Sequence, residues 1–275
     1  MTAIGVLHPG DMGSGIGAVL TGAGHDVRWC PVGRSAATAQ RAAGAGLQPV
    51  PTLAGLADSV DLIISVCPPA FAADVAASVG KSGFAGLYVD ANAISPERVR
   101  SLAPLLPQAS LVDGSIIGPP PPGPTRLHLS GERAHEVAAV FAGTAVTVAL
   151  LDGDVGAASA LKMAYASWSK GSTALAANAQ ALARAFGVEE ALLAEWSAGS
   201  GRPVSEATLQ RAAAAGWRWE GEMEEIAASC AAVGLPPETF AGIAAVFARW
   251  SERRDDRSVP VDALLDDLLG GQSAG

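Results

Sequence analysis

The stretch that decides the fold lies at the N-terminus, where residues 3–13 read AIGVLHPGDMG. Ala3–Leu7 is a short apolar run that predicts a buried strand, and a glycine-rich turn follows it directly. The small residues of Ser14–Gly24 then predict a helix. A strand, a glycine-rich turn and a helix in this order make the unit that binds dinucleotides at a helix N-terminus. The sequence therefore predicts that the chain opens with a dinucleotide-binding domain.

The turn itself supplies the expected phosphate contacts. Gly10 lets the backbone approach a pyrophosphate, and Gly13 lets the helix pack close to the strand. His8 stands where the pattern G-x-G-x-x-G has its first glycine, so His8 either contacts the pyrophosphate or caps the turn. A purely structural turn is the alternative. The residues expected to bind the cofactor here are His8, Gly10, Asp11, Met12 and Gly13.

Short apolar strands and helical stretches alternate as far as Leu150, which predicts a mostly parallel sheet covered on both faces. The further expected strands are Asp26–Cys30, Asp61–Cys67, Gly86–Asp90, Ser110–Asp113, Leu127–Ser130 and Ala145–Leu150. The further expected helices are Ala36–Ala43, Ala70–Val79, Pro96–Leu105 and Glu132–Phe141. Pro119–Pro124 is expected to be a rigid surface loop. Residues 1–150 are thus predicted to form a doubly wound α/β Rossmann domain.

The pattern changes near Leu150. Val155–Phe186 is an almost unbroken run of helix formers, and helical signals continue to about Leu269 without a further strand. The expected breaks are Gly199–Pro203, Gly216, Gly234–Pro237 and Ser258–Pro260, and the terminal GGQSAG is expected to fray. Residues 151–275 are therefore predicted to form an all-α domain for substrate binding and dimerisation. The long helix is apolar nearly all round, which predicts a homodimer that covers it.

Composition excludes several classes of protein. The net charge is −9 and there is no basic run, which argues against nucleic-acid binding. Three cysteines at wide spacing form neither a disulfide framework nor a zinc site. The longest apolar stretch, Val137–Leu151, is too short to span a bilayer, and no leader precedes the first strand. We expect a soluble cytoplasmic protein with no metal, membrane or nucleic-acid partner.

The end of the second strand distinguishes between the two nicotinamide cofactors. NAD-binding domains commonly carry an acidic residue there, which takes the ribose hydroxyls. This chain reads CPVGRS over residues 30–35 and has no acid. The Arg34 guanidinium can hold a 2′-phosphate, with the Ser35 hydroxyl beside it. The alternative is a solvated arginine in a turn, and we expect NADP(H).

Further motifs carry a resemblance to a known family. They are Gly10–Gly13, Gly33–Ser35, Val66–Pro69, Asp90–Pro96, Asp113–Gly118 and Gly156–Lys162. In this order they resemble the motifs of the β-hydroxyacid dehydrogenase superfamily, which includes 6-phosphogluconate dehydrogenase and has the imine reductases as relatives. The resemblance covers nearly the whole chain. It implies a loop near the nicotinamide at Cys67 and Pro68 and a catalytic lysine at Lys162. The segment Trp217–Met223 resembles a poorly characterised branch.

The substrate-binding positions depart from the family pattern. Asn92 and Ile117 stand where the family has serines, Pro119 replaces a glycine, and Ala166 replaces an asparagine. The resemblance therefore supports the family's mode of cofactor binding better than it supports a small hydroxyacid as the substrate. The residues of the corresponding segment that we expect to contact substrate are Ser115, Ile117 and Gly118.

Lys162 is the expected acid–base group. The chain has only three lysines, and a helical projection places Lys162 in a polar stripe on an otherwise apolar helix. It can exchange a proton with the substrate atom that gains or loses hydride. A lysine that snorkels from the helix edge is the alternative. Tyr165 and Asn92 are further catalytic candidates, and Asn92 can also contact the cofactor.

Two candidates lie further along the chain. Lys170 is expected to bind substrate or another anion. The segment from Trp217 to Glu225 is expected to be an amphipathic helix with a solvated acidic face. Alternatively Trp217 or Trp219 contacts the substrate, and the acidic residues then favour a cationic one.

Together these features predict an NADP-dependent oxidoreductase that moves hydride between nicotinamide and a small carbonyl or alcohol. An imine reductase acting on a C=N bond is one alternative. The other is a non-catalytic NADP-binding module.

Overall fold

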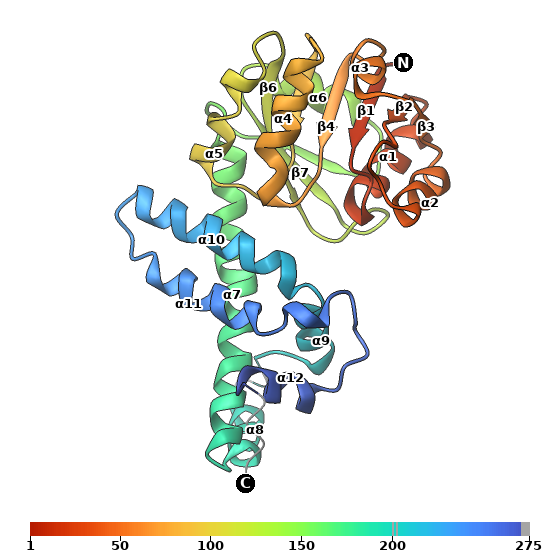
Figure 1. The fold of residues 1–275 in the computed structure, drawn as a ribbon. Coiled ribbons are helices and arrows are strands. Elements are labelled where there is room, and N and C mark those ends of the chain that lie inside the picture. The colour runs from red at the N-terminus through yellow and green to blue at the C-terminus, as the bar shows by residue number, and fades with distance from the viewer. Residues whose placement is uncertain (200, 202, 271–275) are drawn as a thin grey trace. The chain divides into compact units, whose positions relative to one another are not determined.

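The computed structural model describes residues 1–199, 201 and 203–270. The chain divides into two compact units, Met1–Lys162 and Met163–Gly275, which are described separately below (Figure 1). Within the described ranges, no helix combines the length and the apolar character that a membrane span requires. The functional division expected near residue 150 stays a prediction.

The first unit is built on one sheet with the strand order β3-β2-β1-β4-β5-β6-β7-β8. Every neighbouring pair is parallel except β6–β7. The order 3-2-1-4-5-6 is that of dinucleotide-binding sheets. The chain adds strands on one side of β1 as far as β3 and then on the other side from β4 onward, while β1 and β4 themselves run parallel. The prediction of a doubly wound, mostly parallel sheet is confirmed. The strands are β1 (Ala3–Leu7), β2 (Asp26–Trp29), β3 (Gln48–Pro49), β4 (Leu62–Ser65), β5 (Leu87–Asp90), β6 (Ser110–Ile117), β7 (Arg126–Ser130) and β8 (Thr147–Leu150).

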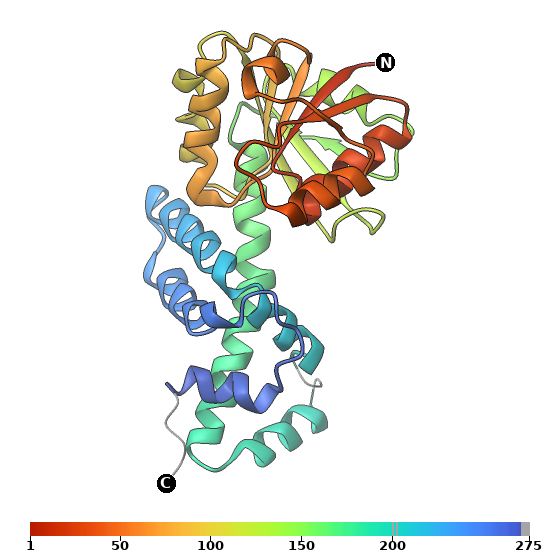
Figure 2. The same ribbon diagram turned by 45° about the vertical axis from the view of Figure 1, so that its right-hand side comes forward.

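Helices cover both faces of this sheet, because the strands are apolar on both sides. One core packs α1 and α6 against the sheet through residues such as Ile16, Leu20 and Val137. The other core packs α3, α4 and α5 through residues such as Leu56 and Val79. Figure 2 shows α4 and α1 on opposite sides of the sheet. The helices are α1 (Asp11–Gly22), α2 (Ala36–Gly44), α3 (Leu53–Ala57), η1 (Pro69–Phe71), α4 (Ala72–Lys81), α5 (Pro96–Arg100), η2 (Ala103–Leu105) and α6 (Ala134–Val140).

Two helix boundaries differ from the prediction for a clear physical reason, and two short elements were not predicted. Helix α1 begins at Asp11 rather than Ser14, because Gly10 already accepts the first helical hydrogen bond from the Ser14 N–H at 2.8 Å. The helix expected to reach Leu105 ends at Arg100 and gives way to η2, since Pro104 has no N–H to continue it. The short elements β3 and α3 were not predicted, because neither is long enough to show a periodicity.

The most informative difference concerns β6. A strand was expected to end at Asp113, with a substrate loop after it. Instead β6 continues to Ile117, because residues 113–117 pair antiparallel with residues 126–130 of β7. Strand β5 ends opposite Asp113, so β6 extends four residues beyond the carboxyl end of its neighbour.

Asp113 fixes the beginning of the long helix α7 (Ala157–Ala185) on this sheet. Its carboxylate is fully buried. Its Oδ2 accepts from the backbone N–H groups of Gly156 at 2.8 Å and Ser159 at 2.9 Å, and its Oδ1 accepts from the Ser159 hydroxyl at 2.8 Å. The Ser130 hydroxyl donates to Asp113 Oδ2 at 3.1 Å and accepts from the Ala158 N–H at 3.0 Å. Three N–H groups that a helix start leaves unpaired are thereby satisfied.

The second unit is helical in all its described elements, as predicted. Its core is centred on Phe247 and Trp250, which are fully buried. The Trp250 indole N–H donates to the Leu264 carbonyl oxygen at 2.9 Å, and Trp219 meets Phe247 edge-on at 5.3 Å between ring centroids. Besides the rest of α7, the elements are α8 (Glu189–Ala198), α9 (Glu206–Ala214), α10 (Gly216–Ala232), α11 (Glu238–Ala248), η3 (Ser251–Arg253) and α12 (Val261–Leu268). The expected frayed end, residues 271–275, and part of the expected break at 199–203 lie outside the described residues.

The replacement Asp113→Ala should lower the free energy of unfolding by about 3–5 kcal/mol, because it removes the acceptor from two backbone N–H groups at the start of α7 and from two buried hydroxyls. Urea unfolding followed by circular dichroism measures the change. Asp154→Ala is the matched control, because this exposed carboxylate lies just before the same helix and should change stability by less than about 0.5 kcal/mol. Equal effects in the two variants would contradict the role assigned to Asp113.

Candidate active site

In the glycine-rich turn between β1 and α1, both Gly10 and Gly13 lie close to the carbonyl oxygen of His8. His8 has a left-handed backbone conformation, with φ +63°, which is why glycine is commonly found at this position. The Gly10 N–H donates to the His8 carbonyl oxygen at 2.7 Å. A Cβ on Gly13 would lie 2.9 Å from the same oxygen, so only glycine fits there without a shift of the backbone.

His8 serves this turn through its backbone. Its Nδ1 is buried and has no hydrogen-bond partner among residues 1–199, 201 and 203–270. Burial, helped by the positive charge of Arg34, lowers the pKa of His8 from 6.5 to about 4. The imidazole is therefore neutral at pH 7 and offers no positive charge to a phosphate. Asp11 and Met12 stand in the first turn of α1, where the Asp11 carboxylate lies 3.7 Å from Arg41 Nε.

Arg34 and Ser35 lie where the chain leaves β2. The Arg34 side chain is exposed, and its Nε donates to the Val32 carbonyl oxygen at 3.3 Å. Ser35 is the N-cap of α2, where its Oγ accepts from the Thr38 N–H at 3.2 Å. The terminal guanidinium nitrogens of Arg34 therefore face solvent next to a helix start, which is an arrangement that suits an anion.

Asn92 connects the carboxyl ends of β4 and β5. Its Oδ1 accepts from the Cys67 N–H at 2.6 Å, and its Nδ2 donates to Asp90 Oδ2 at 2.7 Å and to Ser65 Oγ at 3.4 Å. The side chain is 4% exposed and its polar atoms are occupied by the protein. It thus holds the Cys67–Pro68 loop at the edge of the sheet.

Burial also sets the protonation of two neighbours. It raises the pKa of the Cys67 thiol to about 12, so the thiol is not a nucleophile at neutral pH. It raises the pKa of Asp90 to about 7, against the opposing effect of the hydrogen bonds from Asn92. Asp90 and Asp113 are directly opposite each other on β5 and β6, and their charges repel.

Lys162 lies beside the part of β6 that extends beyond β5. Its Nζ donates to the Ile116 carbonyl oxygen at 2.6 Å, one helical turn after the contact of Ser159 with Asp113. Ile117 is buried, and Gly118 has φ +112° and lies where an added Cβ would be 2.6 Å from the Pro124 carbonyl oxygen. The structure therefore brings Lys162 to the strand that carries the expected substrate residues.

Ser115 and His128 form an unsatisfied polar pair on the same two strands. Ser115 is 1% exposed, and its Oγ has no hydrogen-bond partner in the part of the chain that the structure describes. His128 stands directly opposite on β7, and its Nδ1 is likewise buried without a partner among those residues. Burial and the charge of Arg126 lower the pKa of His128. Sequence reasoning missed His128, since only the antiparallel register of β6 and β7 places it opposite Ser115.

Two of the candidate site residues of the second unit, Lys170 and Trp217, each contact a charged partner. Lys170 forms an ion pair with Glu222, and its Nζ lies 4.8 Å from the centroid of the Trp219 ring. Arg254 stacks on Trp217 at 3.9 Å. Tyr165, a catalytic candidate, is 46% exposed.

The prediction of a solvated acidic face on the Trp217–Glu225 segment is wrong in part. Glu222 is 9% exposed and Glu225 is 8% exposed. The physical reason is charge pairing, because Lys170 on α7 supplies a buried cation that Glu222 can neutralise.

The strand order, the glycine-shaped turn at the start of α1 and the polar edge beyond β4 and β5 define a Rossmann domain. Comparison with known proteins agrees with this class. Residues 183–250 match a domain of unknown function, DUF1932. A curated relative from Methanothermus fervidus, an uncharacterized 28.5 kDa protein in the 7S RNA 5′ region, is 29% identical over 168 residues, which are 61% of this chain and 66% of the relative.

Solved structures extend the likeness to nearly the whole chain. The conserved protein MTH1747, of unknown function but described as similar to 3-hydroxyacid dehydrogenases, is 27% identical with a TM-score of 0.68, over 94% of this chain and all of that one. A Mycobacterium tuberculosis 3-hydroxyisobutyrate dehydrogenase solved with L-serine is 20% identical with a TM-score of 0.72, over 98% and 99%. An Aspergillus terreus reductive aminase solved with NADPH and ethyl levulinate is 19% identical with a TM-score of 0.53, over 97% and 99%. The resemblance to the β-hydroxyacid dehydrogenase superfamily is thereby confirmed, and with it the two-domain fold.

The turn before α1 gives a direct test of the close packing at Gly13. Gly13→Ala should lower the free energy of unfolding by about 1–3 kcal/mol, because the new methyl group meets a backbone oxygen that cannot move freely. Gly22→Ala, at the other end of α1, has open space around it and should be neutral or stabilise by up to about 1 kcal/mol. Chemical denaturation of both variants measures the difference. A Gly13→Ala protein as stable as Gly22→Ala would mean that the turn is not tightly packed.

Proposed function

We propose that the protein is an NADP-dependent oxidoreductase that transfers hydride between nicotinamide and a small carbonyl or alcohol. The observation that carries the proposal is the position of Lys162. Its amine lies 2.6 Å from the Ile116 carbonyl oxygen, on the part of β6 that extends past the carboxyl ends of β4 and β5. In open α/β sheets, ligands bind outside these carboxyl ends.

The residues at the start of α1 and at the ends of β2 and β4 fit a dinucleotide. The α1 N-terminus presents N–H groups behind Gly10, which carries no side chain to obstruct a pyrophosphate. Arg34 would hold a 2′-phosphate, and the residues Cys67 and Pro68, held by Asn92, would lie against the nicotinamide. When bound, the cofactor supplies or accepts the hydride.

The step that the protein's own side chains would perform is a proton transfer. In the reducing direction Lys162 gives a proton from its ammonium group to the carbonyl oxygen of the substrate, and in the oxidising direction the neutral amine takes it back. The Ile116 carbonyl oxygen orients Nζ by accepting one of its hydrogens and leaves the others for the substrate. Asn92 acts as a positioning residue, because its side chain is occupied by Asp90, Ser65 and Cys67.

The residues expected to contact the substrate are more apolar in this chain than at the corresponding positions of the family. Ile117 is buried and stands where the family has a serine, so the hydroxyl that would hold a substrate carboxylate is missing at this position. Pro119, after Gly118, stands where the family has a further glycine. The polar pair Ser115 and His128 remains available on the same strands. We therefore propose a carbonyl or alcohol substrate with one polar group and an apolar body.

NADPH should bind more tightly than NADH, because Arg34 stands where an acidic residue would bind the ribose hydroxyls. Arg34→Ala should weaken NADPH binding by about 1.5–3 kcal/mol, the value of a charge-assisted contact, and leave NADH binding nearly unchanged. Fluorescence titration of both cofactors measures this. Arg257→Ala, which removes an exposed arginine of the second unit, is the control and should change neither affinity. Equal affinities of the wild-type protein for both cofactors would refute the NADP assignment.

Lys162→Met should keep the fold and the affinity for NADPH but lower turnover by roughly 10²–10⁴-fold, the usual contribution of a positioned acid–base group. Methionine matches the stem of lysine in length and volume, so packing should change by less than about 1.5 kcal/mol. Lys81→Met is the control, because Lys81 is exposed at the end of α4. Lys170 is a poorer control, since its removal leaves the buried Glu222 without its cation.

The assay should include a panel of ketones, aldehydes and cyclic imines with NADPH. Turnover of imines alone would replace carbonyl chemistry with imine reduction. NADPH binding without turnover of any substrate would leave a non-catalytic binding module. Unchanged turnover in Lys162→Met would remove the proposed mechanism, whichever substrate is found.

A further inference from the structure

We infer that the Asp90 carboxylate, in its ionised form, holds the Cys67–Pro68 loop through the side-chain amide of Asn92 in the conformation that receives the cofactor. Protonation of Asp90 then releases the loop and weakens cofactor binding. Asp90 is thus a positioning residue that makes the affinity for NADP(H) depend on pH. The inference rests on the proposed function, which places this loop against the nicotinamide.

The orientation of the Asn92 amide determines what Asp90 has to do. The Cys67 N–H can only donate, so Asn92 turns its Oδ1 toward it and accepts at 2.6 Å. The other half of the amide, Nδ2, can only donate, and it lies 2.7 Å from Asp90 Oδ2. The backbone N–H of Asn92 donates to Asp90 Oδ1 at 3.2 Å. Both oxygens of the Asp90 carboxyl group therefore have to accept.

A proton on Asp90 disturbs this arrangement. Protonation turns one of the two carboxyl oxygens into a hydroxyl, which is a donor first and a poor acceptor. One hydrogen bond from Asn92 is then weakened or lost, and the other no longer ends on a charged group, which makes it roughly half as strong. The Asn92 amide cannot compensate by turning over, because its Nδ2 would then meet the Cys67 N–H, donor against donor. The loop is consequently held best when Asp90 is ionised.

The surroundings of Asp90 bring its titration to neutral pH. Asp90 is 1% exposed, and burial raises its pKa to about 7. Asp113, which faces it from β6, raises the pKa as well, because the two carboxylates repel each other. The hydrogen bonds from Asn92 and the positive charge of Arg98 on α5 oppose this rise. The Asp90 carboxyl group therefore changes its charge between pH 6 and pH 8.

Two further titratable groups interact with Asp90, and both keep their charge in this range. Burial raises the pKa of the Cys67 thiol to about 12. Burial also raises the pKa of the Tyr88 hydroxyl, which lies on the same strand as Asp90. Both groups stay protonated between pH 6 and pH 8. A change in the loop over this range therefore reports the charge of Asp90.

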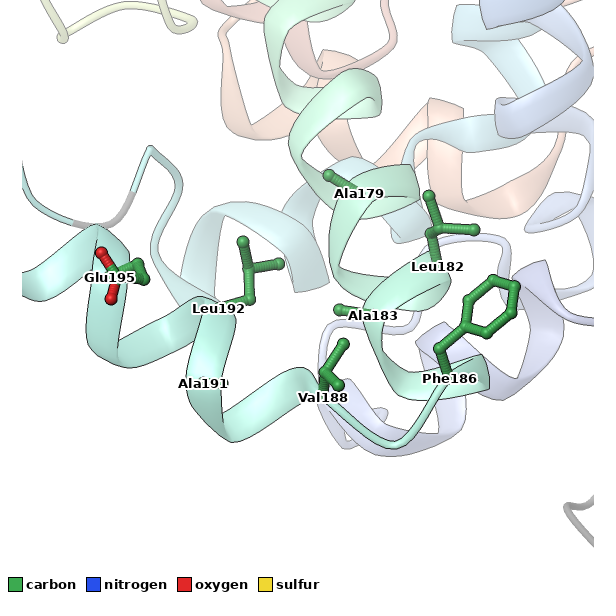
Figure 3. Close-up of a pocket in the computed structure, with 8 residues that line it drawn as sticks. All are labelled: Ala179, Leu182, Ala183, Phe186, Val188, Ala191, Leu192 and Glu195. Atoms are coloured by element: carbon green, nitrogen blue, oxygen red, sulfur yellow. The ribbon is translucent and has the colours of Figure 1, made fainter.

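A pocket in the second unit does not suit the phosphates of the cofactor. It has a volume of about 550 Å³ and lies between the end of α7 and α8. Figure 3 shows Leu182, Val188 and Leu192 around it, together with the carboxylate of Glu195. None of the eight described residues that line it carries a positive charge, and Glu195 would repel a phosphate. Glu195 thereby provides a control carboxylate that is exposed and lies outside the proposed cofactor site.

Fluorescence titration with NADPH at pH 8 and pH 6 tests the coupling. The ionised fraction of Asp90 falls from about nine-tenths to about one-tenth between these values, so the dissociation constant should rise about tenfold. Asp90→Asn should bind about tenfold more weakly than wild type at pH 8 and should lose this dependence, because the carboxamide does not titrate and has a single acceptor oxygen. Glu195→Gln should behave like wild type. NADH is titrated in parallel, because the 2′-phosphate of NADPH itself titrates near pH 6.

A measurement without cofactor tests the loop itself. In ¹⁵N-labelled protein, the amide resonance of Cys67 should shift with a midpoint near pH 7 in wild type and should stay constant in Asp90→Asn. Asn92→Ala keeps Asp90 but cuts its connection to the loop, so it should also remove the pH dependence of NADPH binding. This variant serves as the test where Asp90→Asn does not fold.

Two results would overturn the inference. One is a Cys67 resonance that does not change between pH 6 and pH 8. The other is a tenfold pH dependence of NADPH binding that survives in Asp90→Asn or in Asn92→Ala. Failure of NADPH to bind at either pH would refute the proposed function instead, and the Cys67 resonance would then decide whether Asp90 controls the loop.

Discussion

The buried carboxylate of Asp113 is the interaction on which the first unit's functional edge depends. It ties the middle of β6 to the first turn of α7 through Gly156 and Ser159. A carboxyl group buried at this depth needs hydrogen-bond partners, and backbone N–H groups and hydroxyls supply them here. Once the first turn is fixed, the next turn has one position relative to β6. Lys162 consequently reaches the Ile116 carbonyl oxygen. The amine that we propose as the acid–base group is thereby held by the same strand that carries the expected substrate residues.

A second feature of this edge of the sheet is that several of its polar side chains carry no charge. His8 is neutral at pH 7, the Cys67 thiol is protonated, and Asn92 is fully occupied by protein groups. Two cations of the first unit that can serve a ligand are the exposed Arg34 and the amine of Lys162. One suits a phosphate at the β2 end of the sheet, and the other suits the reacting atom beyond β5. These two positions agree with a cofactor that lies across the point between β1 and β4 where the order of the strands reverses.

Sequence periodicity predicted most of the fold because long apolar strands and helices leave a clear pattern. Ala3–Leu7 and the long helix were found almost to the residue. The pattern failed where pairing decides the structure, as in β6, whose last residues are a strand only because β7 lies beside them. The glycine turn, Arg34 and Lys162 could be chosen as candidates from sequence. His128, the burial of Glu222 and the structural role of Asn92 could not, since each depends on a neighbour distant in the chain.

The central claim is that Lys162 faces the reacting carbon of a bound nicotinamide. A crystal structure of the protein with NADPH tests it most directly. The account predicts the pyrophosphate at the N-terminus of α1, the 2′-phosphate at Arg34, and the nicotinamide C4 near the carboxyl end of β5, with Lys162 Nζ across a gap that admits a small carbonyl. A nicotinamide bound elsewhere, or one whose C4 is shielded from Lys162 by protein, would contradict the account.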